Sequence, residues 1–160
     1  KLAAAGADFL ICPDNTIHQA FSHVGPRSPR PWLHIAEVVA AEAARRRFKR
    51  LGLAGTRWLV ASGVYPDRLA AVGIDCVRPS PQEIDTIDRI IMDELVRGVL
   101  RAESIGCLQR VIERMRDADC DAVILGCTEL PLLMTDANSP LPTLDSTRLL
   151  ARAALRRAIQ

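Results

Sequence analysis

Residues 121–129 read DAVILGCTE, a continuous apolar segment that ends in a glycine, a cysteine, a threonine and a glutamate. A short apolar run of this kind is typical of a strand that is buried on both faces of a parallel sheet. Residues 8–14 read DFLICPD and repeat the arrangement, with Pro13 in place of Gly126 and Asp14 in place of Cys127. The two segments predict strands that each end in a turn carrying a group capable of acid–base chemistry.

The similarity between these two segments has two explanations. They lie too far apart in the chain for a solenoid repeat, and their separation suits a duplicated lobe. Apolar runs are also common in α/β sheets, so chance similarity between two buried strands explains the pattern equally well.

Other short apolar runs alternate with helical patterns along the chain. The predicted strands are 7–12, 32–35, 50–54, 74–77 and 121–125, and the predicted helices are 17–22, 36–48, 57–71, 81–97, 102–116 and 146–160. The alternation predicts an α/β fold in which helices flank a parallel sheet, and the proline-broken segment 129–144 is expected to be a loop. Ligands bind such sheets at the carboxyl ends of the strands, which directs attention to the loops 13–16, 55–58 and 126–129.

Composition excludes several functional classes. Hydrophobic residues make up 49% and charged residues 25% of the 160 residues, which is the composition of a folded domain. The 21 Lys and Arg nearly balance the 19 Asp and Glu, so a nucleic-acid partner is not expected. No apolar stretch approaches the roughly 20 residues of a membrane span.

The cysteines and histidines argue against a metal site. The five cysteines form no CxxC pair, and the three histidines do not share a helical face. An odd number of unpaired cysteines suits reduced thiols, so we expect a cytoplasmic protein without a disulfide framework or a bound metal.

The 13–16 and 126–129 loops suggest a common chemistry. A thiol at a helix N-terminus has a lowered pKa, which is the expectation for Cys127. The Thr128 hydroxyl and nearby backbone N–H groups can hold a carboxylate, and Asn15 and Thr16 offer the same arrangement in the other loop. Two such loops facing each other would flank the α-carbon of an amino acid with two acid–base groups. Glu129 either orients this arrangement or compensates a helix dipole.

The sequence resembles the aspartate/glutamate racemase family. The segments that carry the resemblance are GADFLICPDNTIH (6–18), LHIAE (33–37), LGLAGT (51–56), SGVY (62–65), IIMDEL (90–95) and AVILGCTELPLL (122–133). The resemblance implies a cofactor-independent enzyme that acts on a small amino acid, aspartate or glutamate. It also implies two pseudo-symmetric α/β lobes around a cleft, and a homodimer as a frequent assembly.

The resemblance further implies a division of the chain. The first lobe is expected to be incomplete, with its beginning upstream of Lys1 and its remainder at 1–48. The second lobe is expected at 49–144, and a C-terminal helix at 145–160 is expected to pack back on the first lobe.

The resemblance also implies roles for individual residues. Cys127 matches the second of the family's two catalytic cysteines, and Thr128 matches a carboxylate-binding threonine. Asn15, Thr16 and Thr56 match substrate-binding positions. Arg97 lies within one position of a family lysine that binds a distal carboxylate.

Three positions depart from the family pattern. Asp14 stands at the first catalytic cysteine, Leu59 at a threonine and Leu150 at a histidine. A carboxylate is a weaker base than a thiolate, and burial is the condition that would strengthen it. The departures leave two alternatives to a racemase: a single-cysteine decarboxylase or isomerase, and a non-catalytic protein that binds a dicarboxylate.

Overall fold

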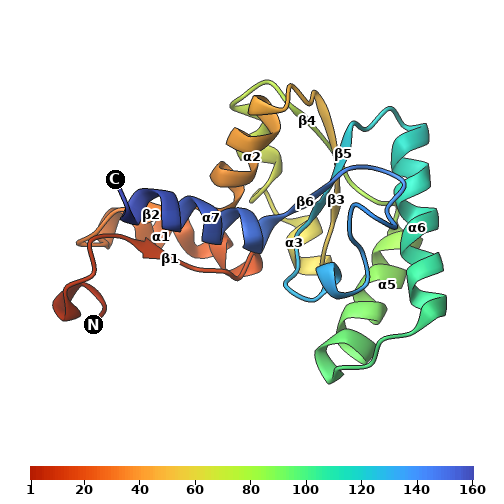
Figure 1. Ribbon diagram of the computed structural model, residues 1–160, viewed down its shortest axis with the longest axis horizontal. Helices are drawn as coiled ribbons and strands as arrows, with labels where there is room; N and C mark the ends of the chain where they lie inside the picture. Colours follow the sequence, from red (N-terminus) through yellow and green to blue (C-terminus); the bar gives the residue numbers. More distant parts are fainter.

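The computed structural model describes all residues from Lys1 to Gln160 and shows an α/β architecture with helices on both faces of a parallel sheet (Figure 1). Four strands form this sheet in the order β4-β3-β5-β6, and β1 and β2 form a second, two-stranded parallel sheet. The strands are β1 (Leu10–Ile11), β2 (Trp32–Leu33), β3 (Arg50–Ala54), β4 (Asp75–Val77), β5 (Ala122–Leu125) and β6 (Thr143–Asp145). The helices are α1 (Phe21–Val24), α2 (Ile35–Arg45), α3 (Arg57–Ala61), α4 (Pro66–Ala70), α5 (Pro81–Arg89), α6 (Ala102–Asp117) and α7 (Ser146–Ala158).

Strands β3 and β5 lie at the centre of the sheet because their side chains are apolar on both faces. All of β5 is buried, and its register pairs Ala54 with Leu125 at the carboxyl ends. The N–H of Gly126 donates to the carbonyl of Ala54 at 2.7 Å, so the turn after β5 begins directly beside the turn after β3. This pairing places two of the predicted loops at one edge of the sheet.

Strand β6 was not expected, and the prediction of a loop throughout 129–144 is wrong at its end. Thr143–Asp145 pairs with Val123–Leu125 at the edge of the sheet. Pro142 precedes the strand and accepts a hydrogen bond from the Val123 N–H through its carbonyl (2.9 Å). Proline is tolerated at the start of an edge strand, because the missing N–H faces away from the ladder.

Two of the predicted helices are interrupted. The 57–71 helix divides into α3 and α4, because the Ser62 hydroxyl donates to the Leu59 carbonyl at 2.6 Å and ends the first helix. The 81–97 helix begins at Pro81 with a capping box between Ser80 and Glu83, as expected, but its second half changes type.

The second half of this helix is a π-helix followed by a 3-10 turn. The π-helix η4 spans Ile90–Glu94, and the 3-10 turn η5 spans Leu95–Arg97. Gly98 then ends the segment with a φ of 73°, a conformation that favours glycine. Single π-helical turns inside helices are frequent at functional sites.

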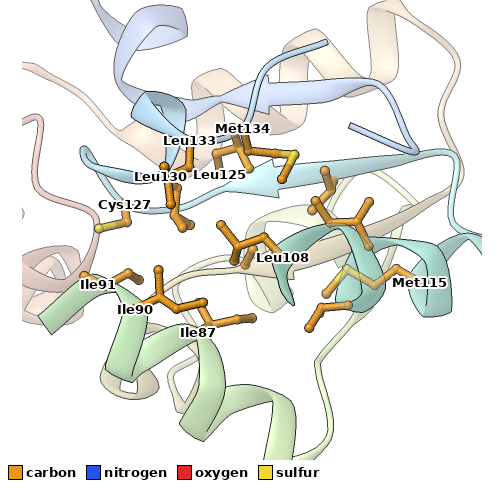
Figure 2. Packing of buried hydrophobic residues seen from close by; sticks show 14 of the residues in the cluster. Ile87, Ile90, Ile91, Leu108, Met115, Leu125, Cys127, Leu130, Leu133 and Met134 are labelled. Carbon is orange, nitrogen blue, oxygen red and sulfur yellow. The ribbon is translucent and has the colours of Figure 1, made fainter. Parts of the chain in front are cut away.

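Each face of the main sheet is covered by its own hydrophobic cluster. Helices α5 and α6 cover one face, and a cluster of 17 buried residues fills the space beneath them (Figure 2). On the other face a cluster of 16 buried residues includes Val39 and Ala43 of α2, Leu69 of α4 and Leu149 of α7. The sheet is therefore buried on both sides, which is the reason for its continuous apolar strands.

Helix α7 joins the two sheets. It packs on α2 and β2, and Figure 1 shows it extending from β6 toward the β1–β2 sheet. The Arg157 guanidinium lies over the ring of Phe9 at 5.0 Å. The buried face of α2 packs in the same cluster as Leu51 and Ile124 of the main sheet. The division at 48/49 and 144/145 stays a prediction.

None of the helices combines the length and the apolar character that crossing a bilayer requires.

Candidate active site

A cleft of about 290 Å³ lies at the carboxyl ends of β3 and β5, facing the loop that follows β1. Its walls come from three parts of the chain: the turn after β1, the turns after β3 and β5, and the η4–η5 segment. The lining residues are Pro13, Asp14, Asn15, Thr16, Thr56, Ile91, Met92, Val96, Gly126, Cys127, Thr128 and Glu129.

The structure thus brings together most of the candidate residues and leaves one outside. Asp14, Asn15, Thr16, Thr56, Cys127 and Thr128 all line the cleft. Arg97 is exposed and does not line it, whereas its neighbour Val96 does. The catalytic and binding roles of these residues stay predictions.

Cys127 lies at the inner end of the cleft. It is 9% exposed and belongs to the hydrophobic cluster under α5 and α6. In Figure 2 it sits at one end of that cluster, near Ile91. The thiol donates a hydrogen bond to Glu129 Oε2 at 2.9 Å.

The expectation of a lowered pKa at Cys127 is wrong. Burial and the hydrogen bond to the Glu129 carboxylate raise the pKa of the thiol to about 12. No long helix follows the turn: residues Leu130–Leu132 form only a single 3-10 turn, so the dipole effect that lowers thiol pKa values is small here. At neutral pH Cys127 is therefore a thiol.

Glu129 is the charged partner of this thiol. Burial opposes its ionisation, but hydrogen bonds from Cys127 and Thr128 outweigh burial and hold the pKa of the carboxyl below its usual range. The Thr128 hydroxyl donates to the same Oε2 at 2.6 Å. The carboxylate thus orients both residues that precede it in the turn.

Close packing explains why glycine stands at position 126 of the turn and leucine at position 59 beneath it. A Cβ added at Gly126 would lie 2.5 Å from Leu59 Cδ2 and 3.1 Å from the Ala54 carbonyl oxygen, so only glycine fits without rearrangement. Leu59 is fully buried in the cluster on the other face of the sheet. Its side chain supports the turn from below and does not line the cleft.

Asp14 occupies the opposite loop in a different environment. Its side chain is exposed, so the burial that would strengthen it as a base is not found. Its Oδ1 accepts a hydrogen bond from the Ile17 N–H at 3.0 Å, and Asp14 lines the cleft. The Asp14 carbonyl is 2.8 Å from His18 Nδ1.

Two threonines meet where the loops approach each other. Thr16 Oγ1 and Thr56 Oγ1 lie 3.3 Å apart and share one hydrogen bond. Thr56 also caps α3 by accepting from the Leu59 N–H at 3.4 Å. Because one proton serves the hydroxyl pair, the second O–H remains to donate to a ligand in the cleft.

A buried polar network holds Asn15 beneath this pair, and no sequence pattern predicts it. Tyr65 donates to Asn15 Oδ1 at 2.6 Å, and Asn15 Nδ2 donates to Ser146 Oγ at 3.0 Å. Ser146 donates in turn to the Leu125 carbonyl at 2.8 Å. Burial raises the pKa of Tyr65 well above its usual range. Asn15 therefore ties the 13–16 loop to the end of β5 and to α7.

Two buried histidines hold the other side of the 13–16 loop. His18 Nε2 accepts from the Ile35 N–H at 3.4 Å, and His34 caps α2 by accepting from the Ala36 N–H at 3.2 Å. Their rings are 4.5 Å apart. Burial lowers the pKa of both, that of His34 to about 4, so both are neutral at pH 7.

Leu150, the last of the three departures from the family pattern, packs in the interior of the protein. Leu150 is buried on α7 with 1% of its surface exposed, and it does not line the cleft.

Comparisons with known proteins identify the family of this chain. A family model described as Asp/Glu/Hydantoin racemase matches residues 1–154. The broad specificity amino-acid racemase RacX of Bacillus subtilis is 23% identical over 155 residues, which cover 97% of this chain and 66% of RacX.

Solved structures show the same fold. An aspartate racemase homologue from Pyrococcus horikoshii is 31% identical with a TM-score of 0.90, over 99% of this chain and 70% of that one. The Picrophilus torridus aspartate racemase is 26% identical with a TM-score of 0.78, over 98% of this chain and 64% of that one. The chain thus spans about two thirds of the length of these relatives. From the family-model match and these likenesses, this chain belongs to the Asp/Glu/hydantoin racemase family.

Proposed function

We propose that this protein racemises an amino acid without a cofactor, by exchange of the α-proton. The observation that carries the proposal is that Cys127 and Asp14 line one cleft, on loops that follow strands of two different sheets. Two acid–base groups around one cleft are what inversion at a carbon centre requires. The names of the relatives support an amino-acid substrate, and the resemblance predicts aspartate or glutamate.

The hydroxyl groups suit the substrate carboxylate. The O–H that the Thr16–Thr56 pair leaves free is a donor at the point where the two loops meet. The carboxylate of Glu129 offers a partner for the α-ammonium group, at a site next to the Cys127 sulfur. Binding at both ends would place the α-carbon between Cys127 and Asp14.

The protonation states define the direction of the first turnover. Asp14, as a carboxylate, removes the α-proton from one face, and Cys127, as a thiol, donates its proton to the other face. The products are the opposite enantiomer, a protonated Asp14 and a Cys127 thiolate. A proton then passes from Asp14 to Cys127 through solvent and restores the starting state. The reverse direction requires the thiolate first, which the positive α-ammonium group beside Glu129 would favour.

Exchange in deuterated water tests the proposal. The protein is incubated with both enantiomers of aspartate, glutamate, methionine and leucine, and α-proton loss and enantiomer composition are followed by NMR and chiral chromatography. We expect loss of the α-proton together with inversion. The absence of exchange with any amino acid tested, at high protein concentration, would overturn the proposal.

A single-cysteine lyase or isomerase is the second candidate. The observation that favours it is that the two acid–base groups of the cleft differ: Cys127 is a buried, protonated thiol, whereas Asp14 is exposed. Such a site suits the one-sided protonation of a carbanion. Release of CO2 from a substituted malonate, lost in Cys127→Ala, would favour this candidate over the racemase. Saturable binding of a dicarboxylate without turnover would favour the non-catalytic alternative.

A further inference from the structure

One wall of the cleft is apolar and is made by the segment that changes helix type. Ile91, Met92 and Val96 line it from η4 and η5. Ile91 is buried and forms the floor beside Cys127, within the same hydrophobic cluster. Met92 and Val96 are 39% and 57% exposed, so they present apolar surface to whatever enters the cleft.

The structure holds this wall in place from behind. The Ser104 hydroxyl on α6 donates to Glu94 Oε2 at 2.5 Å, which turns the acidic side chain of η4 toward α6. The π-helical bond from the Leu95 N–H to the Ile90 carbonyl widens the turn. Leu95 is buried in the cluster, and Val96, the next residue, lines the cleft. The orientation of the wall thus depends on a specific local geometry.

The charged side chains that this chain contributes to the cleft lining are both carboxylates. Asp14 lies on one loop and Glu129 on the other. They suit the α-ammonium group of an amino acid, and they repel a second carboxylate on its side chain. Arg97, the residue that the resemblance associates with a distal carboxylate, is exposed and lies outside the lining.

We infer that the Ile91–Met92–Val96 wall is the side-chain subsite and that it accepts an uncharged, apolar amino-acid side chain, such as that of methionine or leucine. The inference rests on the proposed function and narrows its substrate class, away from the aspartate or glutamate that the resemblance predicts. Methionine side chains are flexible and polarizable, so Met92 can adapt to apolar groups of different shape.

Binding measured without turnover tests the inference separately from the reaction. The Cys127→Ala variant of the full chain is titrated with L-methionine, L-leucine, L-aspartate and L-glutamate, and affinity is measured by calorimetry or NMR shifts. We expect methionine and leucine to bind at least tenfold more tightly than the two acidic amino acids. Tighter binding of aspartate or glutamate would overturn the inference, as would binding of none of the four.

A charge placed on the wall provides the matched comparison. Val96→Lys, made in the same background, should shift the affinity ratio toward aspartate and glutamate by at least tenfold. Val99→Lys adds the same charge at an exposed apolar residue outside the lining and should leave the ratio unchanged. An equal shift in both variants would overturn the inference. Exchange by the unmodified protein tests the proposed function independently, because a racemase specific for acidic amino acids would pass that test and fail this one.

Discussion

The two loops that face each other across the cleft differ in how the fold holds them. The 126–129 loop follows β5, a fully buried central strand, and its cysteine belongs to a hydrophobic cluster. The 13–16 loop follows β1, a strand of two residues in a two-stranded sheet, and its aspartate is exposed. Burial and the hydrogen bond to Glu129 keep the proton on Cys127, whereas the buried side chain of Asn15 anchors the 13–16 loop through hydrogen bonds and leaves Asp14 exposed. Cys127 and Asp14 occupy equivalent positions in the sequence pattern, but the fold places them in different environments.

Removal of the buried thiol should have the largest effect. Cys127→Ala is expected to reduce α-proton exchange by about 10²- to 10⁴-fold, the range typical of a lost acid–base group. The measurement is α-proton loss in deuterated water. Cys120→Ala, a buried cysteine of the same cluster that does not line the cleft, serves as the control and should remain within a few-fold of the unmodified protein. Equal losses in the two variants would point to general destabilisation.

Acidic pH should lower the free energy of unfolding, because His34, which lies beside the 13–16 loop, then becomes protonated. The pKa of His34 is lowered to about 4 by burial, with smaller contributions from the charges of His18 and Arg68. Between pH 6.5 and about 4 the unfolded chain binds a proton that the folded chain rejects, so stability is present above this range and falls as the pH is lowered. The loss due to His34 is about 3 kcal/mol.

Urea denaturation at pH 7.5, 5.5 and 4.5 measures this effect. His34→Gln removes the titrating group and keeps an acceptor for the helix cap, so its stability should depend less on pH over the same range. A pH dependence that is unchanged in His34→Gln would show that other groups are responsible.

Changes at Asp14 should separate inversion from exchange. Asp14→Asn removes the group that takes the α-proton in the proposed first step, so inversion should fall by about 10²-fold, the lower end of the range for a lost acid–base group. Any exchange that remains should occur at the face that Cys127 serves, through its thiolate, with retention of configuration. Asp14→Cys should raise the rate of inversion, because a thiolate is a stronger base than a carboxylate. Chiral chromatography combined with NMR distinguishes these outcomes, and unchanged inversion in Asp14→Asn would remove Asp14 from the mechanism.

The smallest expected effect concerns the thiol itself. Glu129→Gln removes the negative charge and replaces the carboxylate acceptor, which together raise the pKa of Cys127, by a neutral amide, so that pKa should fall while staying above its usual range, because burial is the larger cause. The pH dependence of iodoacetamide alkylation measures the change. Asp14→Asn removes the other carboxylate of the cleft without touching the sulfur and is the matched control. A midpoint that does not move in Glu129→Gln would contradict this account of the thiol.

The elements that could be predicted are those whose residues act locally or are apolar on every side. Strand β3 was predicted at 50–54 as observed, because a short apolar run followed by glycine is typical of a buried parallel strand. The capping box at Ser80 and Glu83 is a local interaction, and the start of α5 followed from it. Strand β6 was not predicted because the proline before it is typical of a loop. Its extended structure depends on pairing with β5, which the local sequence does not show.

The candidate site was predictable in position and not in its electrostatics. The rule that ligands bind at the carboxyl ends of parallel strands directs attention to residues 13–16, 56 and 126–129, and the structure shows them lining one cleft although β1 belongs to a separate sheet. The raised pKa of Cys127 depends on burial and on the side chain of Glu129, which no spacing reveals. Likewise, Tyr65 and Ser146 reach Asn15 across long stretches of chain, and only the tertiary structure brings them there.

By itself the sequence determined the α/β class, the central strands and the family, because apolar periodicity and short motifs are properties of neighbouring residues. Only the tertiary structure decided that Glu129 accepts the hydrogen bond of the Cys127 thiol and that this thiol keeps its proton. It also decided which side chains of the 90–97 segment line the cleft. The physical reason is that charge, desolvation and side-chain contacts act through space between residues that are distant in the chain.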